Sequence, residues 1–199
     1  MKVVAFHGSP RKEGNTAGLV KHVFSELEKE GIQTELIQLP PSKTQGCVAC
    51  YKCFEAQNAK CAIDDELNGH LSKMLEADGI ILASPTYFAD VTPQMKALMD
   101  RAGLVAKANG GLLKRKVGAA VVAVRRGGAI HAFDSMNHFF TIGEMIVVGS
   151  DYWNMGIGLG PGDAEKDKEG VETMRKLGRN MAWLLKKLGC ACQGQSAHP

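Results

Sequence analysis

The sequence predicts an α/β fold: a doubly wound, five-stranded parallel sheet between two layers of helices, a three-layer α/β/α sandwich. Short apolar runs alternate five times with longer segments of helical period. Strands separated in this way by helices pair in parallel through right-handed crossovers, so that helices cover both faces of the sheet. Val117–Val124 is the longest β-branched run, as expected of a central strand that is buried on both faces.

Five strands are predicted from the apolar runs. Lys2–His7 is the first, and Thr34–Gln38 is a short second. Gly79–Ser84 reads Gly-Ile-Ile-Leu-Ala-Ser, which is typical of a buried strand. Val117–Val124 is the fourth strand, and Met145–Val148 is the fifth.

The helices are predicted from apolar spacing and from their caps. Asp64 and Asp65 can cap the second helix, which runs to about Ala77. Thr92 and Pro93 give the third an N-cap followed by proline at the first helical position. The other predicted ranges are Thr16–Glu30 for the first helix, Pro93 to about Arg101 for the third, Ala129–Ile142 for the fourth and about Lys166–Leu188 for the last.

Length and composition favour a single domain over residues 1–199, with a cysteine-rich loop inserted at about 40–63 and a polar C-terminal tail at about 189–199. At 199 residues and 45% hydrophobic content, the chain can bury a substantial core. The net charge of +3 comes from interspersed residues of both signs, so neither a nucleic-acid nor a membrane partner is expected. The apolar run Val3–Phe6 is too short for a signal peptide or a membrane span, which predicts a cytoplasmic protein.

A polar loop follows the first strand and leads into the first helix. It reads Gly-Ser-Pro-Arg-Lys-Glu-Gly-Asn-Thr over residues 8–16, so hydroxyls, an amide, a guanidinium and backbone N–H groups gather at a helix N-terminus and suit a phosphate. Neither a P-loop nor the glycine pattern of a dinucleotide fold is present. A terminal monophosphate, as in FMN, fits better. The alternative is an ordinary polar turn in which Thr16 caps the helix.

Two further loops follow the third and fourth strands, at the edge where open α/β sheets bind ligands. Ser-Pro-Thr-Tyr-Phe at residues 84–88 presents a hydroxyl and two aromatic rings that suit an isoalloxazine. Tyr87 and Phe88 would equally serve as core or subunit-contact residues. Arg-Arg-Gly-Gly at residues 125–128 lets backbone approach a ring closely and places positive charge beside a reduced flavin. Three such loops at one edge favour a flavin site.

These motifs, with Gly-Ser-Asp-Tyr-Trp-Asn-Met at residues 149–155, resemble the flavodoxin-like NAD(P)H-dependent FMN reductase superfamily, specifically its iron–sulfur flavoprotein branch, over nearly the whole chain. The resemblance implies FMN as the cofactor and allows NAD(P)H as a co-substrate. At the FMN phosphate it implies Ser9, Arg11, Asn15 and Thr16. Around the ring it implies Pro85, Thr86, Tyr87, Phe88, Arg126, Gly127 and Gly128. The cofactor carries the chemistry, so no catalytic side chain is predicted.

Four cysteines lie between the second strand and the next helix: Cys47, Cys50, Cys53 and Cys61. A Cys-x-x-Cys-x-x-Cys run can wrap three corners of a cubane, and the nearby fourth thiolate can complete the shell. Structural zinc more often uses two separate Cys-x-x-Cys knuckles. The run resembles the compact cluster motif of iron–sulfur flavoproteins, with its fourth cysteine at the long end of that pattern. A [4Fe–4S] cluster is therefore predicted, with free or oxidised thiols and zinc as alternatives.

Three functions follow from these sites. In the first, FMN and the [4Fe–4S] cluster form an electron-transfer oxidoreductase that exchanges electrons with a partner such as ferredoxin. The second is a cluster-free NAD(P)H-dependent reductase of FMN or a quinone, and the third is a zinc- or thiol-bearing binding module without turnover. A homodimer or homotetramer is expected, because the reductases that this sequence resembles commonly place the flavin at a subunit boundary.

Overall fold

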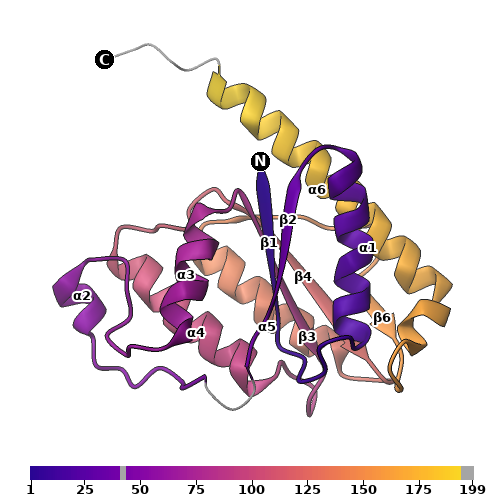
Figure 1. The fold of residues 1–199 in the computed structure, drawn as a ribbon, viewed down its shortest axis with the longest axis horizontal. Coiled ribbons are helices and arrows are strands. Elements are labelled where there is room, and N and C mark those ends of the chain that lie inside the picture. The colour runs from indigo at the N-terminus through magenta and orange to yellow at the C-terminus, as the bar shows by residue number, and fades with distance from the viewer. Residues whose placement is uncertain (41–43, 194–199) are drawn as a thin grey trace.

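The computed structural model describes residues 1–40 and 44–193 (Figure 1). Its sheet has the strand order β2-β1-β3-β4-β5, with β6 also paired to β4, and every pairing is parallel. This is the strand order of flavodoxin-like sheets, so the predicted doubly wound α/β architecture is confirmed. The strands are β1 (Lys2–His7), β2 (Gln33–Gln38), β3 (Gly79–Pro85), β4 (Val117–Val124), β5 (Ile146–Val147) and β6 (Met155–Ile157).

The described sheet has one strand more than predicted, because the fifth strand is divided. β5 pairs with β4 at Val117 and Gly118, whereas β6 pairs with the far end of β4, over Val122–Val124. Between the two, the Asn154 side chain donates to the carbonyl of Ala120 at 3.0 Å and so holds the segment to β4. A strand of three residues is too short for a periodic pattern to reveal.

Helices cover both faces of the sheet. On one face, α1 (Asn15–Lys29) and α6 (Lys168–Gln193) pack side by side over a core that includes Val3. On the other, α3 (Glu66–Glu76), α4 (Pro93–Ala108) and α5 (Ala129–Ile142) cover a core that includes Val4. Neighbouring strand residues point to opposite faces, so Val3 and Val4 belong to different cores. Two short elements lie in connections: α2 (Lys52–Ala56) and the 3₁₀ helix η1 (Asp163–Lys166).

Two helices extend beyond their predicted ends. α4 continues past Arg101 to Ala108, because Ala102 and Val105 add buried apolar side chains to its inner face. α6 continues past Leu188 to Gln193, so the predicted polar tail is helical at its start. The prediction for residues 194–199 falls outside the described residues. In the described part of the chain, none of the helices combines the length and apolarity that a membrane crossing needs.

The loop after β1 is held against the start of α4. The Gly8 N–H donates to the carbonyl of Ala83 at 2.8 Å, and the Gln94 side chain donates to the carbonyl of Gly8 at 2.6 Å. A Cβ on Gly8 would lie 2.2 Å from Thr92 Oγ1, so only glycine allows this approach. The carboxyl ends of β1 and β3 therefore meet the N-terminus of α4 at one edge of the sheet.

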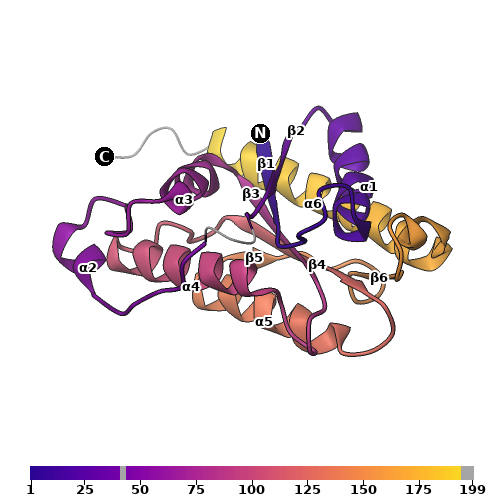
Figure 2. The ribbon, with the colours of Figure 1, turned by 60° about the horizontal axis from the view of Figure 1, so that its bottom comes forward.

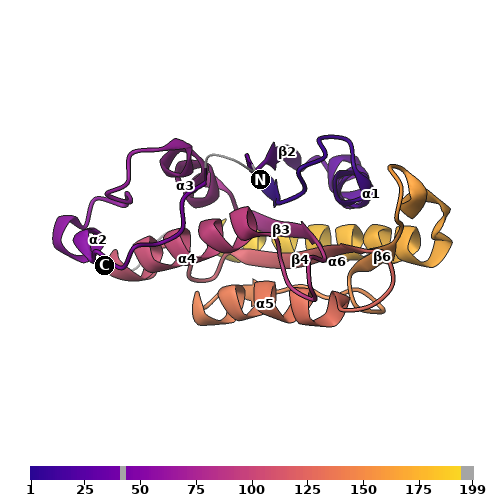
Figure 3. The same cartoon turned by 90° about the horizontal axis from the view of Figure 1, so that it is seen from below.

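The cysteine loop lies elsewhere. Figure 2 and Figure 3 show α2 at the outer edge of the molecule, beyond α3 and α4, and Figure 1 shows the same placement from a third direction. The loops that follow β1 and β3 lie at the bottom of the view in Figure 1, apart from α2. One chain therefore presents two separate places where the sequence predicts chemistry.

Candidate functional site

An open pocket, here called the strand-end pocket, lies at the carboxyl ends of β1, β3 and β4. Its wall is formed by the phosphate loop (residues 8–16), the turn after β3 and the segment after β6. The predicted site residues that line it are Ser9, Arg11, Asn15, Thr16, Pro85, Thr86 and Tyr87. Pro10, Gly14, Ala123, Arg125, Gly158 and Leu159 complete the lining.

α1 begins at this pocket, and no side chain caps its first backbone N–H groups. The N-cap is Gly14, and the first turn carries no acidic residue. A Cβ on Gly14 would lie 3.0 Å from Arg11 Cβ and 3.4 Å from Ser9 Oγ, so the phosphate loop closes tightly here. Thr16 is buried inside the helix rather than capping it. N–H groups at the positive end of a helix dipole suit a bound anion.

Asn15 and Arg11 tie the phosphate loop to the segment after β6. The Asn15 side chain donates to the carbonyl of Gly160 at 2.9 Å and accepts from the Ala164 N–H at 3.2 Å. One Arg11 nitrogen, Nη1, donates to the carbonyl of Leu159 at 3.3 Å, while the side chain remains exposed. The amide of Asn15 is thus occupied within the protein, whereas the guanidinium of Arg11 keeps free donors for a ligand.

An unpartnered hydroxyl lies in the wall of the strand-end pocket. The Thr86 N–H donates to the carbonyl of Ala123 at 2.9 Å, which fixes the backbone after β3. Thr86 Oγ1 is buried and has no hydrogen-bond partner among the described residues. Buried polar groups in folded proteins are nearly always paired. The Thr86 hydroxyl is therefore a candidate contact for a ligand that has a polar edge.

A tight turn after β3 carries the predicted aromatic residues. Tyr87 and Asp90 exchange two backbone hydrogen bonds, of 2.8 and 3.0 Å, and Phe88 and Ala89 between them have φ values of 47° and 63°. This is a type I′ turn, which normally selects glycine or asparagine. Tyr87 lines the pocket, whereas Phe88 is fully exposed at the tip of the turn.

Four residues expected around the ring are not among those that line the pocket: Phe88, Arg126, Gly127 and Gly128. Arg125, the first residue of the same motif, takes the place in the wall. Gly128, at a φ of 87°, packs against the turn instead, since a Cβ there would lie 2.9 Å from Ala89 Cα. Sequence reasoning also missed Gly158 and Leu159, because they follow β6, a strand that was not predicted.

His7, the last residue of β1, is buried beneath the phosphate loop and titrates far from its usual range. Burial lowers the pKa of His7 to about 4, against a smaller opposing effect of Glu13. The unfolded chain therefore binds more protons than the folded one between pH 4 and 6.5, and stability must fall as pH drops through that window.

We expect the free energy of unfolding to fall by on the order of 2–3 kcal/mol between pH 6.5 and 4 because of His7. Urea unfolding across this range measures it. His7→Gln, which does not titrate, is expected to flatten the profile whatever its effect on absolute stability. An equally steep profile in His7→Gln would place the pH dependence elsewhere.

A second cavity, here called the cysteine cavity, is lined by the four predicted cluster ligands: Cys47, Cys50, Cys53 and Cys61. None of them forms a disulfide. Burial raises the pKa of Cys53, so a metal bound there would displace a proton. The backbone around Cys50 is left-handed on both sides, with φ values of 51° at Ala49 and 56° at Tyr51. Such conformations persist where the surrounding structure fixes them.

Among the side chains that the structure describes, those of residues 1–40 and 44–189, no three His, Cys, Asp or Glu groups lie as the ligands of one metal ion would. A cubane has an iron at each ligated corner, so its four thiolates stand farther apart than the ligands of one zinc ion. Four thiols around one cavity are the donor set that iron–sulfur clusters use.

α4 connects the two sites. Thr92, its N-cap, lies against the phosphate loop, and Arg101, Leu104 and Val105 line the cysteine cavity. At 1.5 Å per residue, Thr92 and Arg101 are about 14 Å apart along the helix axis. The strand-end pocket and the cysteine cavity are thus held at a fixed separation by one rigid element.

Residues 1–160 match the NADPH-dependent FMN reductase family. The chain is 43% identical to an iron–sulfur flavoprotein of Methanocaldococcus jannaschii over 193 residues, which covers 94% of this chain and 98% of the relative. It is 34% identical to an iron–sulfur flavoprotein of Methanosarcina thermophila over 187 residues, covering 93% and 95%. A flavodoxin from the domain Archaea shares the fold, with a TM-score of 0.62 at 19% identity, covering 94% of this chain and 99% of the other. The chain therefore belongs to the NADPH-dependent FMN reductase family, in its iron–sulfur flavoprotein branch, and is an FMN-dependent oxidoreductase.

Proposed function

We propose that this oxidoreductase is an electron-transfer flavoprotein in which FMN occupies the strand-end pocket and a [4Fe–4S] cluster is bound by Cys47, Cys50, Cys53 and Cys61. One observation carries the proposal. The three strand-end loops line one cavity and the four cysteines line another, and each cavity has the donor chemistry of its cofactor.

The FMN phosphate is assigned to the N-terminus of α1. There the backbone N–H groups lack a capping side chain, and the Ser9 hydroxyl and Arg11 guanidinium line the same pocket. Thr16 lies in the first turn and adds a hydroxyl. Asn15 positions the loop, because both polar atoms of its side chain are bonded to backbone of the segment after β6.

The ring is assigned to the Pro85, Thr86 and Tyr87 side of the pocket. When bound, FMN can take up two electrons as a hydride and release them singly. The Thr86 hydroxyl is free to bond a polar edge of the ring, and Arg125 can place positive charge near it. The other residues expected around the ring lie outside this wall: Phe88, Arg126, Gly127 and Gly128.

The cluster proposed for the cysteine cavity exchanges electrons with the partner one at a time. NAD(P)H is the proposed hydride donor, in keeping with the name of the family, and a small redox protein such as ferredoxin is the proposed one-electron partner. α2, which carries Cys53, lies at the outer edge of the fold (Figure 3), where another protein can approach it.

A homodimer or homotetramer is proposed as the working assembly. Segments next to the strand-end pocket expose apolar side chains to solvent, among them Phe88, Tyr152, Trp153 and Leu159. Exposed apolar groups of this kind mark interaction surfaces. Light scattering tests the assembly, and a monomer would contradict it.

Anaerobic purification followed by assays of FMN, iron, sulfide and zinc tests the function as a whole. The presence of FMN, together with iron and sulfide in amounts equal to each other, supports the proposal. FMN without iron would instead favour the cluster-free reductase of FMN or a quinone. Zinc without FMN would overturn both and leave a binding module.

Thr86→Val is expected to weaken FMN binding by about 0.5–1.5 kcal/mol, the net worth of one hydrogen bond. The apoprotein should be as stable as the wild type or slightly more so, because the replaced hydroxyl has no partner in the protein. Fluorescence titration with FMN and thermal unfolding of the apoprotein measure the two effects.

Thr92→Val is the matched control. Thr92 Oγ1 is also buried without a partner but does not line the pocket. The control should therefore share the small effect on apoprotein stability and leave FMN affinity unchanged. Equal losses of affinity in both variants would show that Thr86 does not contact the cofactor.

A further inference from the structure

Arg101 is a charged side chain in the interior of the protein. It lies on α4, its side chain is 0% exposed, and it lines the cysteine cavity. Arginine is rarely buried to this extent unless its charge is paired and its N–H groups are bonded. The partners of its guanidinium therefore indicate what the side chain does.

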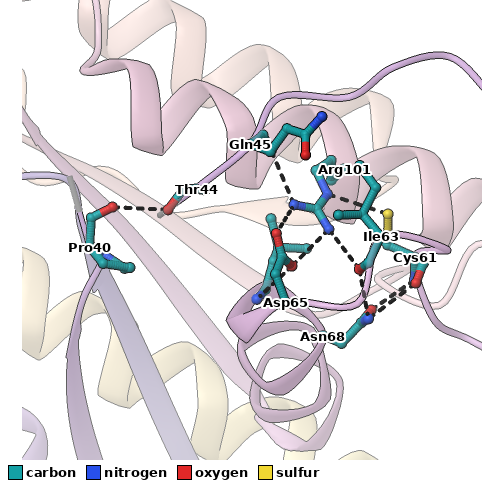
Figure 4. Close-up of polar contacts among 9 residues, drawn as sticks. Pro40, Thr44, Gln45, Cys61, Ile63, Asp65, Asn68 and Arg101 are labelled. Atoms are coloured by element: carbon teal, nitrogen blue, oxygen red, sulfur yellow. Dashed lines mark hydrogen bonds and ion pairs between the residues drawn. The ribbon is translucent and has the colours of Figure 1, made fainter. Parts of the chain in front are cut away.

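Each of the five N–H groups of Arg101 has an acceptor (Figure 4). Nη1 donates to Asp65 Oδ2 at 2.6 Å and to the carbonyl of Gln45 at 3.1 Å, and Nη2 donates to Asp65 Oδ1 at 2.9 Å and to the carbonyl of Ile63 at 3.2 Å. The fifth group, Nε–H, donates to Cys61 Sγ at 3.3 Å. The bidentate pair with Asp65 orients the guanidinium so that Nε–H is aimed at the sulfur.

Asp65 and Asn68 fix the other side of this arrangement. Asp65 is the N-cap of α3 and also accepts from the Leu67 N–H at 3.1 Å, so its carboxylate is fixed to the start of that helix. Asn68 accepts from the Cys61 N–H at 2.8 Å and donates to the Cys61 carbonyl at 3.1 Å. Cys61 is thus held through its backbone by α3 and through its sulfur by α4 (Figure 4).

We propose that Arg101 is a positioning and tuning residue for the cluster: its Nε–H bond to Cys61 Sγ, oriented by Asp65, makes the cluster easier to reduce. The proposal rests on the proposed function, because it needs the cluster at the four cysteines. A donor aimed at a ligating sulfur stabilises the more negative, reduced state. Arginine stays protonated in both redox states of the cluster. Reduction therefore adds one electron to the cluster, and no bond to the protein forms or breaks.

The same geometry predicts opposite effects for the two members of the ion pair. Arg101→Lys keeps a positive charge but loses the fork and the bond from Nε–H to sulfur, so the cluster should become harder to reduce. Asp65→Asn keeps the size of the side chain and one acceptor oxygen that still orients the guanidinium, but it removes a negative charge next to the cavity. The cluster should therefore become easier to reduce. A merely structural role would not produce shifts of opposite sign.

An anaerobic redox titration with dithionite as the electron donor, followed by electron paramagnetic resonance, measures the midpoint potential. For Arg101→Lys we expect the ratio of reduced to oxidised cluster at a fixed potential to fall by about tenfold, a midpoint about 59 mV more negative for a one-electron couple. Asp65→Asn should shift it in the positive direction. Lys96→Arg, an exchange of cations on the exposed face of α4, is the control and should leave the midpoint unchanged.

The outcomes separate this inference from the proposed function. Wild-type protein without iron and sulfide would overturn the cluster itself. Wild type with a cluster, and variants with an unchanged midpoint or with shifts of the same sign, would overturn only the tuning role of Arg101. Loss of the cluster from both variants would also overturn it, since the pair would then serve only to hold the loop.

Discussion

Replacing Cys50 by alanine is expected to lower bound iron and sulfide by at least about tenfold while FMN stays bound. Loss of outer-shell partners alone changes metal affinity by about 10–100-fold, so loss of a ligand should cost no less. The cysteine cavity and the strand-end pocket share no lining residue, so the FMN content should not follow the iron content. Iron, sulfide and flavin assays on anaerobically purified protein give all three values.

Cys50 suits this test better than Cys53. Its side chain is exposed, whereas Cys53 is buried and its truncation would also open a cavity in the core. Lys52→Ala, in the same segment and also exposed, does not line the cysteine cavity; it is the matched control and should keep its iron. Wild-type iron content in Cys50→Ala would exclude Cys50 as a ligand.

Arg11→Ala is expected to raise the Kd for FMN by about 10–150-fold, the equivalent of the 1.5–3 kcal/mol that a hydrogen bond to a charged group contributes. Arg11 lines the pocket beside the N-terminus of α1, and only Nη1 is engaged, with the carbonyl of Leu159. Because the Arg11 side chain is exposed, its contribution to FMN binding should weaken as the salt concentration rises. Titrations at low and high ionic strength should show a weaker salt dependence in the variant than in the wild type.

Lys12→Ala removes the same charge from the next position of the phosphate loop. Lys12 is exposed and does not line the pocket, so its replacement should change FMN affinity little. If Arg11→Ala and Lys12→Ala weakened FMN equally, the phosphate would be attracted by the general charge of the loop and not by a bond to Arg11.

Local pattern was sufficient to locate much of the fold. The bounds of β1, β4 and α5 coincide with the predicted ranges Lys2–His7, Val117–Val124 and Ala129–Ile142. β1 and β4 are apolar runs of strand length, and turn residues such as Gly127 and Gly128 end the second of them. The hydrophobic effect acts on such segments wherever the rest of the chain lies, so their sequence alone determines them.

The site was predictable to the extent that its residues lie at strand ends. The phosphate loop and the Pro85–Tyr87 turn follow β1 and β3 directly, and a parallel sheet brings such loops together. Gly158 and Leu159 escaped prediction because β6 has three residues and exists only through its pairing with β4. The exposure of Phe88 at the tip of a type I′ turn is likewise a property that residue type does not reveal.

By itself the sequence determined the α/β class, the order of the main elements, the phosphate loop and the four cysteines, since each depends on residues that are neighbours along the chain. Only the tertiary structure decided that Arg101 pairs with Asp65 and donates to Cys61, or that Asn15 bonds the segment after β6. Those partners are 36 to 149 residues apart. Hydrogen bonds depend on distance and angle in space, and packing alone sets those for residues so far apart in sequence.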